Sequence, residues 1–243
     1  MVKLVKGLHI VEGVKYDDSD LNVVAIVEDD GSVHIVDCGD PGCGEQILGY
    51  LQKHVRDPPR IRTLILTHFD ADHSGSAAEL KRMTGCTIMA PEFDAEIISG
   101  RRFTNEEMRR VLPAYAPGEI EALERKIEGQ EIPVVPVDRV LRGDERLDFV
   151  GGVRVLRVQG HTPGHIVLLV PRLSALIAGD VMTAPDGRIG PPMPQYTPSP
   201  ERAIQSLKSL AELEFEILVP YHFPPIKAGG SKALKRYLRT LDK

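Results

Sequence analysis

The stretch Thr67-His68-Phe69-Asp70-Ala71-Asp72-His73-Ser74-Gly75 decides how this chain is interpreted. It follows the apolar run Thr63-Leu64-Ile65-Leu66, whose length and composition predict a buried strand. Two histidines and two aspartates are thus crowded together where a strand leaves the core. Carboxylates held this close repel one another or lose solvation unless a cation compensates them. The stretch predicts a metal site, and a solvated loop without metal stays open as an alternative from these residues alone.

Length and composition allow a substantial core. The chain has 243 residues, of which 42% are hydrophobic, enough for one large domain or two small ones. It has no apolar run long enough for a transmembrane helix, so no membrane association is expected. The segment from Met1 to Lys6 lacks the apolar stretch and cleavage site of a signal peptide, and a cytoplasmic location is the expectation.

Charge and cysteine content disfavour two further classes of protein. The chain carries 30 Lys and Arg against 35 Asp and Glu, a net charge of −5, and has no block of basic residues. Nucleic-acid binding needs a positive surface, so no nucleic-acid partner is expected. Cys38, Cys43 and Cys86 are odd in number and lack CxxC spacing, which indicates neither a disulfide framework nor a thiolate zinc site.

Hydrophobic patterning predicts strands and helices mixed along the chain. Two apolar runs around Asp29-Asp30-Gly31-Ser32 indicate a hairpin. The other expected strands are 63–66, 153–158, 166–170, 175–178 and 215–219, and the expected helices are 44–55, 74–83, 199–213 and 231–241.

Segment 101–130 differs from its surroundings and is predicted to be a helical insertion. Thr104 to Glu107 fits a capping box, and Ile120, Leu123 and Ile127 recur at helical spacing. This apolar stripe suits a lid over a site, and a solvated pair of surface helices is the alternative. Residues 183–198, rich in Pro and Gly, are expected to form a long loop. A homodimer interface formed by both segments is a further alternative.

Potential metal ligands recur at the ends of the expected strands. Besides the 68–73 cluster, they are Asp37, His161 within Gly160-His161-Thr162-Pro163-Gly164-His165, Asp180 after Gly179, and His222. Rigid strand ends can hold metal ligands without strain. One histidine after a strand is commonly structural, but five such sites in this order are hard to explain by chance.

These motifs resemble those of the metallo-β-lactamase superfamily, which includes glyoxalase II, lactonases and flavodiiron proteins. The resemblance covers nearly the whole length and implies one α/β domain over residues 1–243. The implied fold is an αββα sandwich, in which two mixed β-sheets lie face to face with helices outside. It also implies a metal site along one sheet edge.

The resemblance further implies a dinuclear site. His68 and His161 would bind the first metal, Asp72, His73 and His222 the second, and Asp180 would bridge them. Asp37 would orient a ligand imidazole from behind.

One position departs from the family's hydrolase pattern, which has His where this chain has Asp70. Flavodiiron proteins carry a carboxylate at that place, so Asp70 is expected to be a ligand of the first metal. An oxygen ligand is harder than an imidazole and reduces the positive charge of the site. Two divalent ions are expected, with zinc first and iron or manganese as competitors.

The implied activity is metal-dependent hydrolysis of a small-molecule ester, thioester or lactone. Asp72 is the candidate group for orienting the nucleophile, and Tyr221 for contacting the oxyanion. His165 is expected to support the site or touch the substrate. Arg188, Met193 and Tyr196 are the expected substrate contacts, with Met182 and Ile189 as further apolar ones.

Two considerations bear on the choice of substrate and reaction. Only a short segment follows His222, so the helical domain with which glyoxalase II binds glutathione is not expected. A non-haem iron oxidoreductase, either flavodiiron-like or persulfide dioxygenase-like, is the alternative that Asp70 favours. A binding protein on an inactive scaffold is disfavoured, because every ligand position holds a residue able to bind metal.

Overall fold

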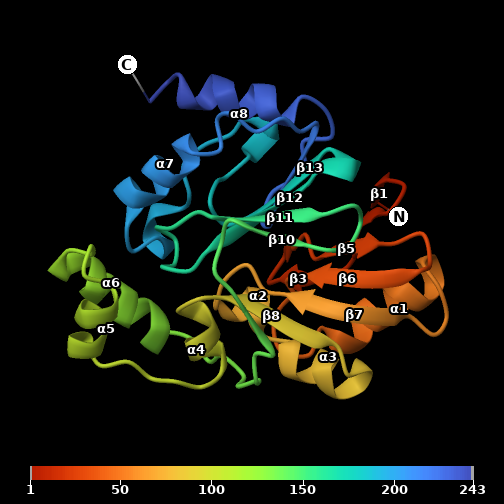
Figure 1. Cartoon of the computed structure of the whole chain (residues 1–243), viewed down its shortest axis with the longest axis horizontal. Helices are drawn as coiled ribbons and strands as arrows, with labels where there is room; N and C mark the ends of the chain where they lie inside the picture. The colour runs from red at the N-terminus through yellow and green to blue at the C-terminus, as the bar shows by residue number, and fades with distance from the viewer. Residues whose placement is uncertain (1, 242–243) are drawn as a thin grey trace.

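The computed structural model describes residues 2–241, in which two β-sheets lie face to face between layers of helices (Figure 1). The first sheet contains, in spatial order, β1 (Val2–Val5), β2 (Leu8–Ile10), β5 (Val24–Val27), β6 (Ser32–Val36), β7 (Arg60–Ile65), β8 (Thr87–Pro91) and β9 (Arg139–Leu141). The second contains β10 (Glu145–Leu147), β11 (Val153–Arg157), β12 (Ile166–Val170), β13 (Ala175–Gly179) and β14 (Ile217–Pro220). A small hairpin pairs β3 (Lys15–Tyr16) with β4 (Ser19–Asp20).

Both sheets are mixed. Strands β6 to β9 run parallel, whereas β1, β2 and β5 are antiparallel additions. In the second sheet β10 to β13 are antiparallel, and β14 runs parallel to β13. The parallel strands end at the same edge of their sheets, so the segments that follow them are brought together.

Helices cover the outer face of each sheet. The helices are α1 (Gly44–His54), α2 (Ala71–Ser74), α3 (Ala77–Thr84), α4 (Asp94–Ile98), α5 (Asn105–Val111), α6 (Pro117–Glu128), α7 (Pro200–Lys208) and α8 (Gly230–Leu238). Figure 1 shows α7 and α8 above the second sheet and α3 below the first. The inner side chains of α1 pack in the same apolar cluster as those of α3. No helix of residues 2–241 is long and apolar enough to cross a membrane.

Alternation along the strands explains this four-layer arrangement. Successive side chains of a strand point to opposite faces. In β12, Ile166 and Leu168 pack between the two sheets, while Val167 and Leu169 pack against the layer that contains Leu207 of α7. The expected αββα sandwich of two mixed sheets is therefore confirmed.

Segment 101–130 contains α5 and α6, and its capping box is confirmed. The Thr104 hydroxyl accepts from the Glu107 backbone N–H at 3.2 Å, and the Glu107 carboxylate accepts from the Thr104 N–H at 2.8 Å. The stripe Ile120, Leu123 and Ile127 is buried in the same apolar cluster as the inner face of α1. The protein's own core covers this stripe, which is not free for a partner subunit.

Some boundaries differ from those expected. The helix expected at 74–83 begins only at Ala77, as α3, because Ser74 is instead the last residue of α2, where its hydroxyl donates back to the carbonyls of Phe69 and Asp70. Helix α8 begins after Gly229, which has a positive φ of 71°, and not at Ser231. The helix expected to reach residue 213 ends at Lys208.

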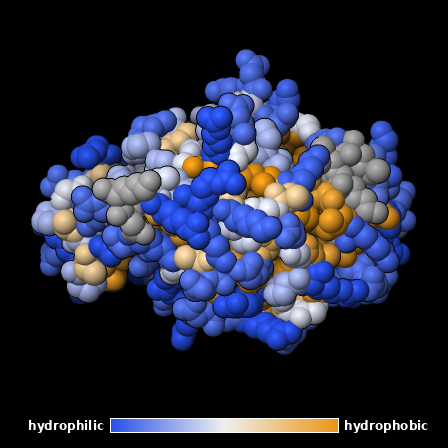
Figure 2. All heavy atoms as spheres, turned by 90° about the horizontal axis from the view of Figure 1, so that it is seen from above, coloured by the Kyte–Doolittle hydropathy of each residue, from blue (hydrophilic) through white to orange (hydrophobic). Residues whose placement is uncertain are grey.

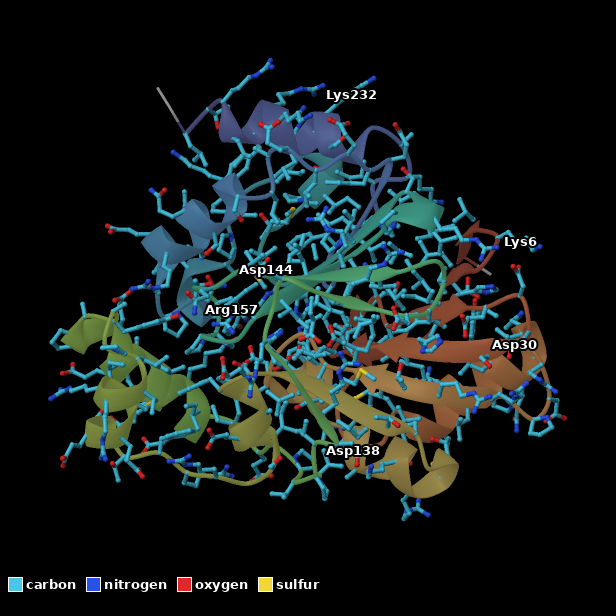
Figure 3. The ribbon with its side chains drawn as sticks, in the orientation of Figure 1. Lys6, Asp30, Asp138, Asp144, Arg157 and Lys232 are labelled. Atoms are coloured by element: carbon cyan, nitrogen blue, oxygen red, sulfur yellow. The ribbon has the colours of Figure 1, made fainter. Side chains whose placement is uncertain are left out.

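Charged side chains cover the outside and link the layers. In Figure 3 Lys232 of α8 and Asp30 of the β5–β6 hairpin lie at the periphery. Arg157, at the end of β11, donates to the carboxylate of Glu92 at 3.1 Å and thereby links the second sheet to the segment after β8 (Figure 3). The face seen from above is mostly hydrophilic, with hydrophobic residues interspersed (Figure 2).

Candidate metal centre

The site forms where parallel strands of both sheets end. Asp37 follows β6, the 68–73 cluster follows β7, Asp180 follows β13 and His222 follows β14. His161 comes from the connection between β11 and β12. The backbone N–H of Ile166 donates to the Thr67 carbonyl at 3.1 Å, so this connection is attached directly to the first sheet.

The candidate metal ligands lie close together. Three groups of side chains each have ligand atoms within 4.8 Å of one another: His68 with His73 and Asp180; His68 with Asp70 and His161; and Asp72 with His73 and His222. Within residues 2–241, His68 Nε2, His73 Nε2 and Asp180 Oδ1 are buried without a hydrogen-bond partner. Leaving a buried polar atom unpaired costs about 1–3 kcal/mol. Bonds to a metal ion would satisfy all three atoms, so these residues fit one.

Thr67 and Asp37 fix which nitrogen each of two imidazoles presents. The Thr67 hydroxyl donates to Asp37 Oδ2 at 2.8 Å, so its lone pair is free to accept from His68 Nδ1 at 3.0 Å. The same Asp37 oxygen lies 2.9 Å from His73 Nδ1 and accepts from it. Both rings thereby present Nε2 to the site, and His73 Nε2 lies 3.4 Å from Asp180 Oδ1. Asp37 thus contacts the Nδ1 side of the candidate ligand His73, on the ring edge away from the site.

A second hydroxyl acts in the same way on His161. Thr197 donates to the carbonyl of Met193 at 2.8 Å and therefore accepts from His161 Nδ1 at 3.3 Å. Burial and the nearby Lys126 ammonium lower the pKa of His161 to about 4, so the ring is neutral at physiological pH. A neutral imidazole with a free Nε2 is the form that binds metal.

Carboxylates and imidazoles perturb one another strongly. Burial opposes the charged form of Asp180, but His73 and His222 hold its pKa well below the usual range. Burial also opposes the charged form of His222 and so lowers its pKa. The carboxylates of Asp180 and Asp72 outweigh this effect and raise the pKa of His222 to about 9. Without a metal ion, protonated imidazoles compensate the negative charge of the carboxylates. A divalent cation would compensate that charge more completely.

His165 and Tyr221 both make hydrogen bonds that bear on their predicted roles. His165 is fully buried, and its Nε2 accepts from the Asp180 backbone N–H at 3.1 Å, so it supports Asp180 and does not reach solvent. The Tyr221 hydroxyl donates to the Asp72 carbonyl at 2.6 Å and accepts from the Gly39 N–H at 3.1 Å. With its hydroxyl occupied and its ring buried, Tyr221 positions Asp72, and the geometry gives no support for an oxyanion contact.

Asp94 is a buried residue at the site that sequence reasoning missed. Its carboxylate accepts from the Phe69 N–H at 3.1 Å, the Thr162 hydroxyl at 2.7 Å and the Gly164 N–H at 2.8 Å. It thereby joins the loop of His68 to the loop of His161. Burial raises the pKa of Asp94 to about 7, against the lowering effect of these three hydrogen bonds.

The close approach of Asp94 explains the glycine at position 164. A Cβ atom placed on Gly164 would lie 2.3 Å from Asp94 Oδ2 and 2.2 Å from the Glu92 carbonyl oxygen. Only glycine fits there.

Lys126 is a second residue of the site that no sequence pattern indicates. Its ammonium lies 2.5 Å from Asp70 Oδ2 and 3.3 Å from His161 Nε2. Burial raises the pKa of Asp70, but Lys126 and His68 outweigh it and hold this pKa well below the usual range. The two halves of the site therefore differ. The groups around His73 fit a metal ion, whereas the group around Asp70 already contains a cation.

A cavity of about 970 Å³ opens beside the site. Asp72, Asp180 and His222 line it, together with the end of α6 and the loop 193–198. Of the expected substrate contacts, Met193 and Tyr196 lie in its wall. Arg188 is exposed and outside the lining, and Met182 is buried in the core beneath α7 and α8.

The fold and the converging His and Asp residues define a metallo-hydrolase of the αββα type. The family model described as the metallo-beta-lactamase superfamily matches residues 18–222. The chain belongs to the metallo-β-lactamase superfamily and is a metal-dependent hydrolase.

Relatives agree with this assignment. The chain is 24% identical to the probable metallo-hydrolase YflN of Bacillus subtilis over 233 residues, which span 91% of this chain and 85% of that protein. It is 29% identical to hydroxyacylglutathione hydrolase of Dechloromonas aromatica over 182 residues, which span 74% of this chain. That match covers 50% of the relative, so the chain corresponds to about half of its length.

Solved structures show the same fold. A metallo-beta-lactamase family protein from Thermus thermophilus superposes with a TM-score of 0.64 at 23% identity, covering 98% of this chain and 79% of that one. A metallo-beta-lactamase superfamily protein from Sulfolobus tokodaii superposes with a TM-score of 0.67 at 18% identity, covering 98% and 86%. At these identities the similarity establishes the fold alone.

Proposed function

We propose that the chain uses a divalent metal ion held by Asp72, His73, Asp180 and His222 to hydrolyse a small ester, thioester or lactone. The observation that carries the proposal is the buried ion pair of His73 Nε2 and Asp180 Oδ1, in which neither atom makes a hydrogen bond. They lie 3.4 Å apart, next to a cavity large enough for a small molecule.

The ion supplies Lewis acidity, which polarises a carbonyl and lowers the pKa of a water molecule. The chain's own groups position the reactants. The side chain of Asp72 is 18% exposed, against 7% for Asp180, and it faces the cavity. Its Oδ2 lies 3.2 Å from His222 Nε2, so it can accept a proton from a water molecule beside His222. The other carboxylates, those of Asp37, Asp70 and Asp180, are buried.

The substrate class rests on similarity and on the cavity. The hydroxyacylglutathione hydrolases that the chain resembles are named for a thioester substrate, which supports a thioester here. The wall of the cavity combines apolar Met193 and Pro194 with charged Arg125 and Glu131, which suits a small molecule with both kinds of surface. Mixed histidine and carboxylate ligands suit zinc, and the number of oxygen ligands lets iron or manganese compete.

The oxidoreductase alternative depended on Asp70 as a metal ligand. The Lys126 ammonium lies 2.5 Å from Asp70 Oδ2 and competes with a metal ion for that carboxylate, which weakens the support for the alternative. Hydrolysis is the one function we propose.

The test is a comparison of substrates with protein loaded with zinc, manganese or iron. A hydroxyacylglutathione thioester, an aryl ester and a lactone are supplied, and chelated protein serves as the blank. We expect hydrolysis of at least one of them and a loss of at least about 100-fold for His222→Gln. A control variant, His54→Gln, changes a histidine outside the site and should keep the rate. Metal-loaded protein that hydrolyses none of the three contradicts the proposal.

A further inference from the structure

Lys126 is placed as a component of the site and not as a surface residue. It projects from α6, and its side chain is 8% exposed. Its ammonium donates to Asp70 Oδ2 at 2.5 Å and to the Tyr196 carbonyl at 2.8 Å, and it lies 3.3 Å from His161 Nε2. Two of the three N–H donors of the ammonium thus have oxygen acceptors. His161 Nε2 lies 3.1 Å from the same Asp70 oxygen, so the imidazole and the ammonium share that carboxylate.

A second residue of the same segment holds the other oxygen of Asp70. Gln130 follows α6, and its side-chain N–H donates to Asp70 Oδ1 at 3.0 Å. Its side-chain carbonyl accepts from the Ala71 N–H at 2.7 Å. Both carboxylate oxygens of Asp70 are therefore occupied by groups from one segment. Such a network of buried hydrogen bonds around one carboxylate is a built feature of the site.

A metal ion in the same place would conflict with this ammonium. An ion bonded to Asp70 Oδ2 at the roughly 2.1 Å typical of metal–oxygen bonds would lie less than about 5 Å from Lys126 Nζ. Both charges would be positive, and the side chains of Lys126 and Asp70 are only 8% and 9% exposed, which strengthens the repulsion. Moving Lys126 away would break its hydrogen bonds to Asp70 and to the Tyr196 carbonyl.

We propose that the Lys126 ammonium is the built-in cation of the first site, so the chain binds one divalent ion in place of the two implied by family resemblance. That ion lies at Asp72, His73, Asp180 and His222. His68 serves the same ion, because its Nε2 is also grouped with His73 and Asp180. Helix α6 then places a fixed positive charge, the Lys126 ammonium, in the wall of the cavity. This inference rests on the proposed metal-dependent function.

The test is the number of ions bound, measured without substrate. Metal-stripped protein is titrated with Zn²⁺ by calorimetry, and the zinc retained after gel filtration is measured by elemental analysis. The wild type is expected to bind one ion per chain, and Lys126→Met, which keeps the apolar stem, is expected to bind two. Removing the ammonium should tighten binding of the second ion by at least about 100-fold.

Three further variants locate the effect. Arg125→Met changes the neighbouring cation of α6, which lines the same cavity, and should leave one ion. Lys126→Arg keeps the charge and should also leave one. The double variant Lys126→Met with Asp70→Asn should return to one ion, because the second ion then lacks its carboxylate.

The possible results separate this inference from the proposed function. A wild type that binds two ions with similar affinity overturns the inference, and so does folded Lys126→Met that still binds one. A wild type that binds no ion overturns the proposed function itself. If Lys126→Met does not fold, two ions on Lys126→Gln support the inference, and one ion overturns it.

Discussion

Asp94 and Thr162, 68 residues apart in the chain, are joined by a 2.7 Å hydrogen bond that holds the two histidine loops together. The other partners of the Asp94 carboxylate are backbone N–H groups of those same loops. The geometry of His68 relative to His161 therefore depends on a residue that contacts neither imidazole directly.

Asp94→Ala should lower the free energy of unfolding by about 3 kcal/mol, because it leaves two backbone N–H groups and one hydroxyl buried without acceptors. Metal affinity should fall by about 10- to 100-fold as the loops loosen. Urea unfolding and zinc titration measure the two effects. Asp138→Asn is the control, since that carboxylate is partly exposed and its ion pair with Lys81 is worth less than about 1 kcal/mol. Equal effects of the two variants would contradict the role given to Asp94.

Thr67→Val should weaken zinc binding by about tenfold while it keeps the volume of the side chain. The hydroxyl that donates to Asp37 and accepts from His68 Nδ1 is lost, so His68 is no longer held with Nε2 towards the site. The control is Thr63→Val on β7, the strand that precedes Thr67. The Thr63 hydroxyl also contacts a histidine, His34, but lies away from the site. We expect both variants to lose stability and only Thr67→Val to lose zinc affinity.

Zinc affinity should fall as the pH is lowered below about 9. The pKa of His222 is raised to about 9 by Asp180 and Asp72, against the effect of burial. At pH 7 the metal-free ring is therefore protonated, and binding must displace that proton. Affinity should drop about tenfold per pH unit for each proton released. Calorimetry in two buffers with different ionisation enthalpies measures the release. An absence of proton release at pH 7 would show that His222 is not a ligand.

Substrate affinity should depend on the loop 193–198. Tyr196→Ala removes an aromatic ring from the cavity wall and should raise KM about tenfold with little change in kcat. Arg188→Ala is the control, because its exposed side chain lies outside the cavity lining. If KM rises for Arg188→Ala and stays unchanged for Tyr196→Ala, the prediction is wrong. Arg188 would then bind the substrate, and Tyr196 would not.

The closeness of the candidate ligands could be predicted from the sequence because most of them lie just after a strand. Asp180 directly follows the apolar run of β13, and His68 follows that of β7, so position along the chain indicates position in the site. Periodicity also located β5, β6 and β12. It missed β9, where Arg139 and Val140 are exposed at the sheet edge and carry no alternating pattern.

Lys126 and Asp94 could not be found in this way. The partner of Lys126 is 56 residues away, and the helix that carries it has an ordinary amphipathic pattern in which a lysine next to Arg125 indicates a solvated face. Asp94 lies in a segment without any metal-ligand motif. Both roles arise from tertiary packing, in which α6 is folded back over the site and α4 begins beneath two loops.

The central claim is that hydrolysis depends on a metal ion held by Asp72, His73, Asp180 and His222. The most direct measurement is the rate of hydrolysis of the best substrate while metal-stripped protein is titrated with Zn²⁺, for the wild type and for Asp180→Asn. We predict that the stripped wild type is inactive, that its rate rises in proportion to bound zinc, and that Asp180→Asn recovers less than about 1% of the rate. Stripped wild type that keeps its full rate, or Asp180→Asn that recovers it, would contradict the account.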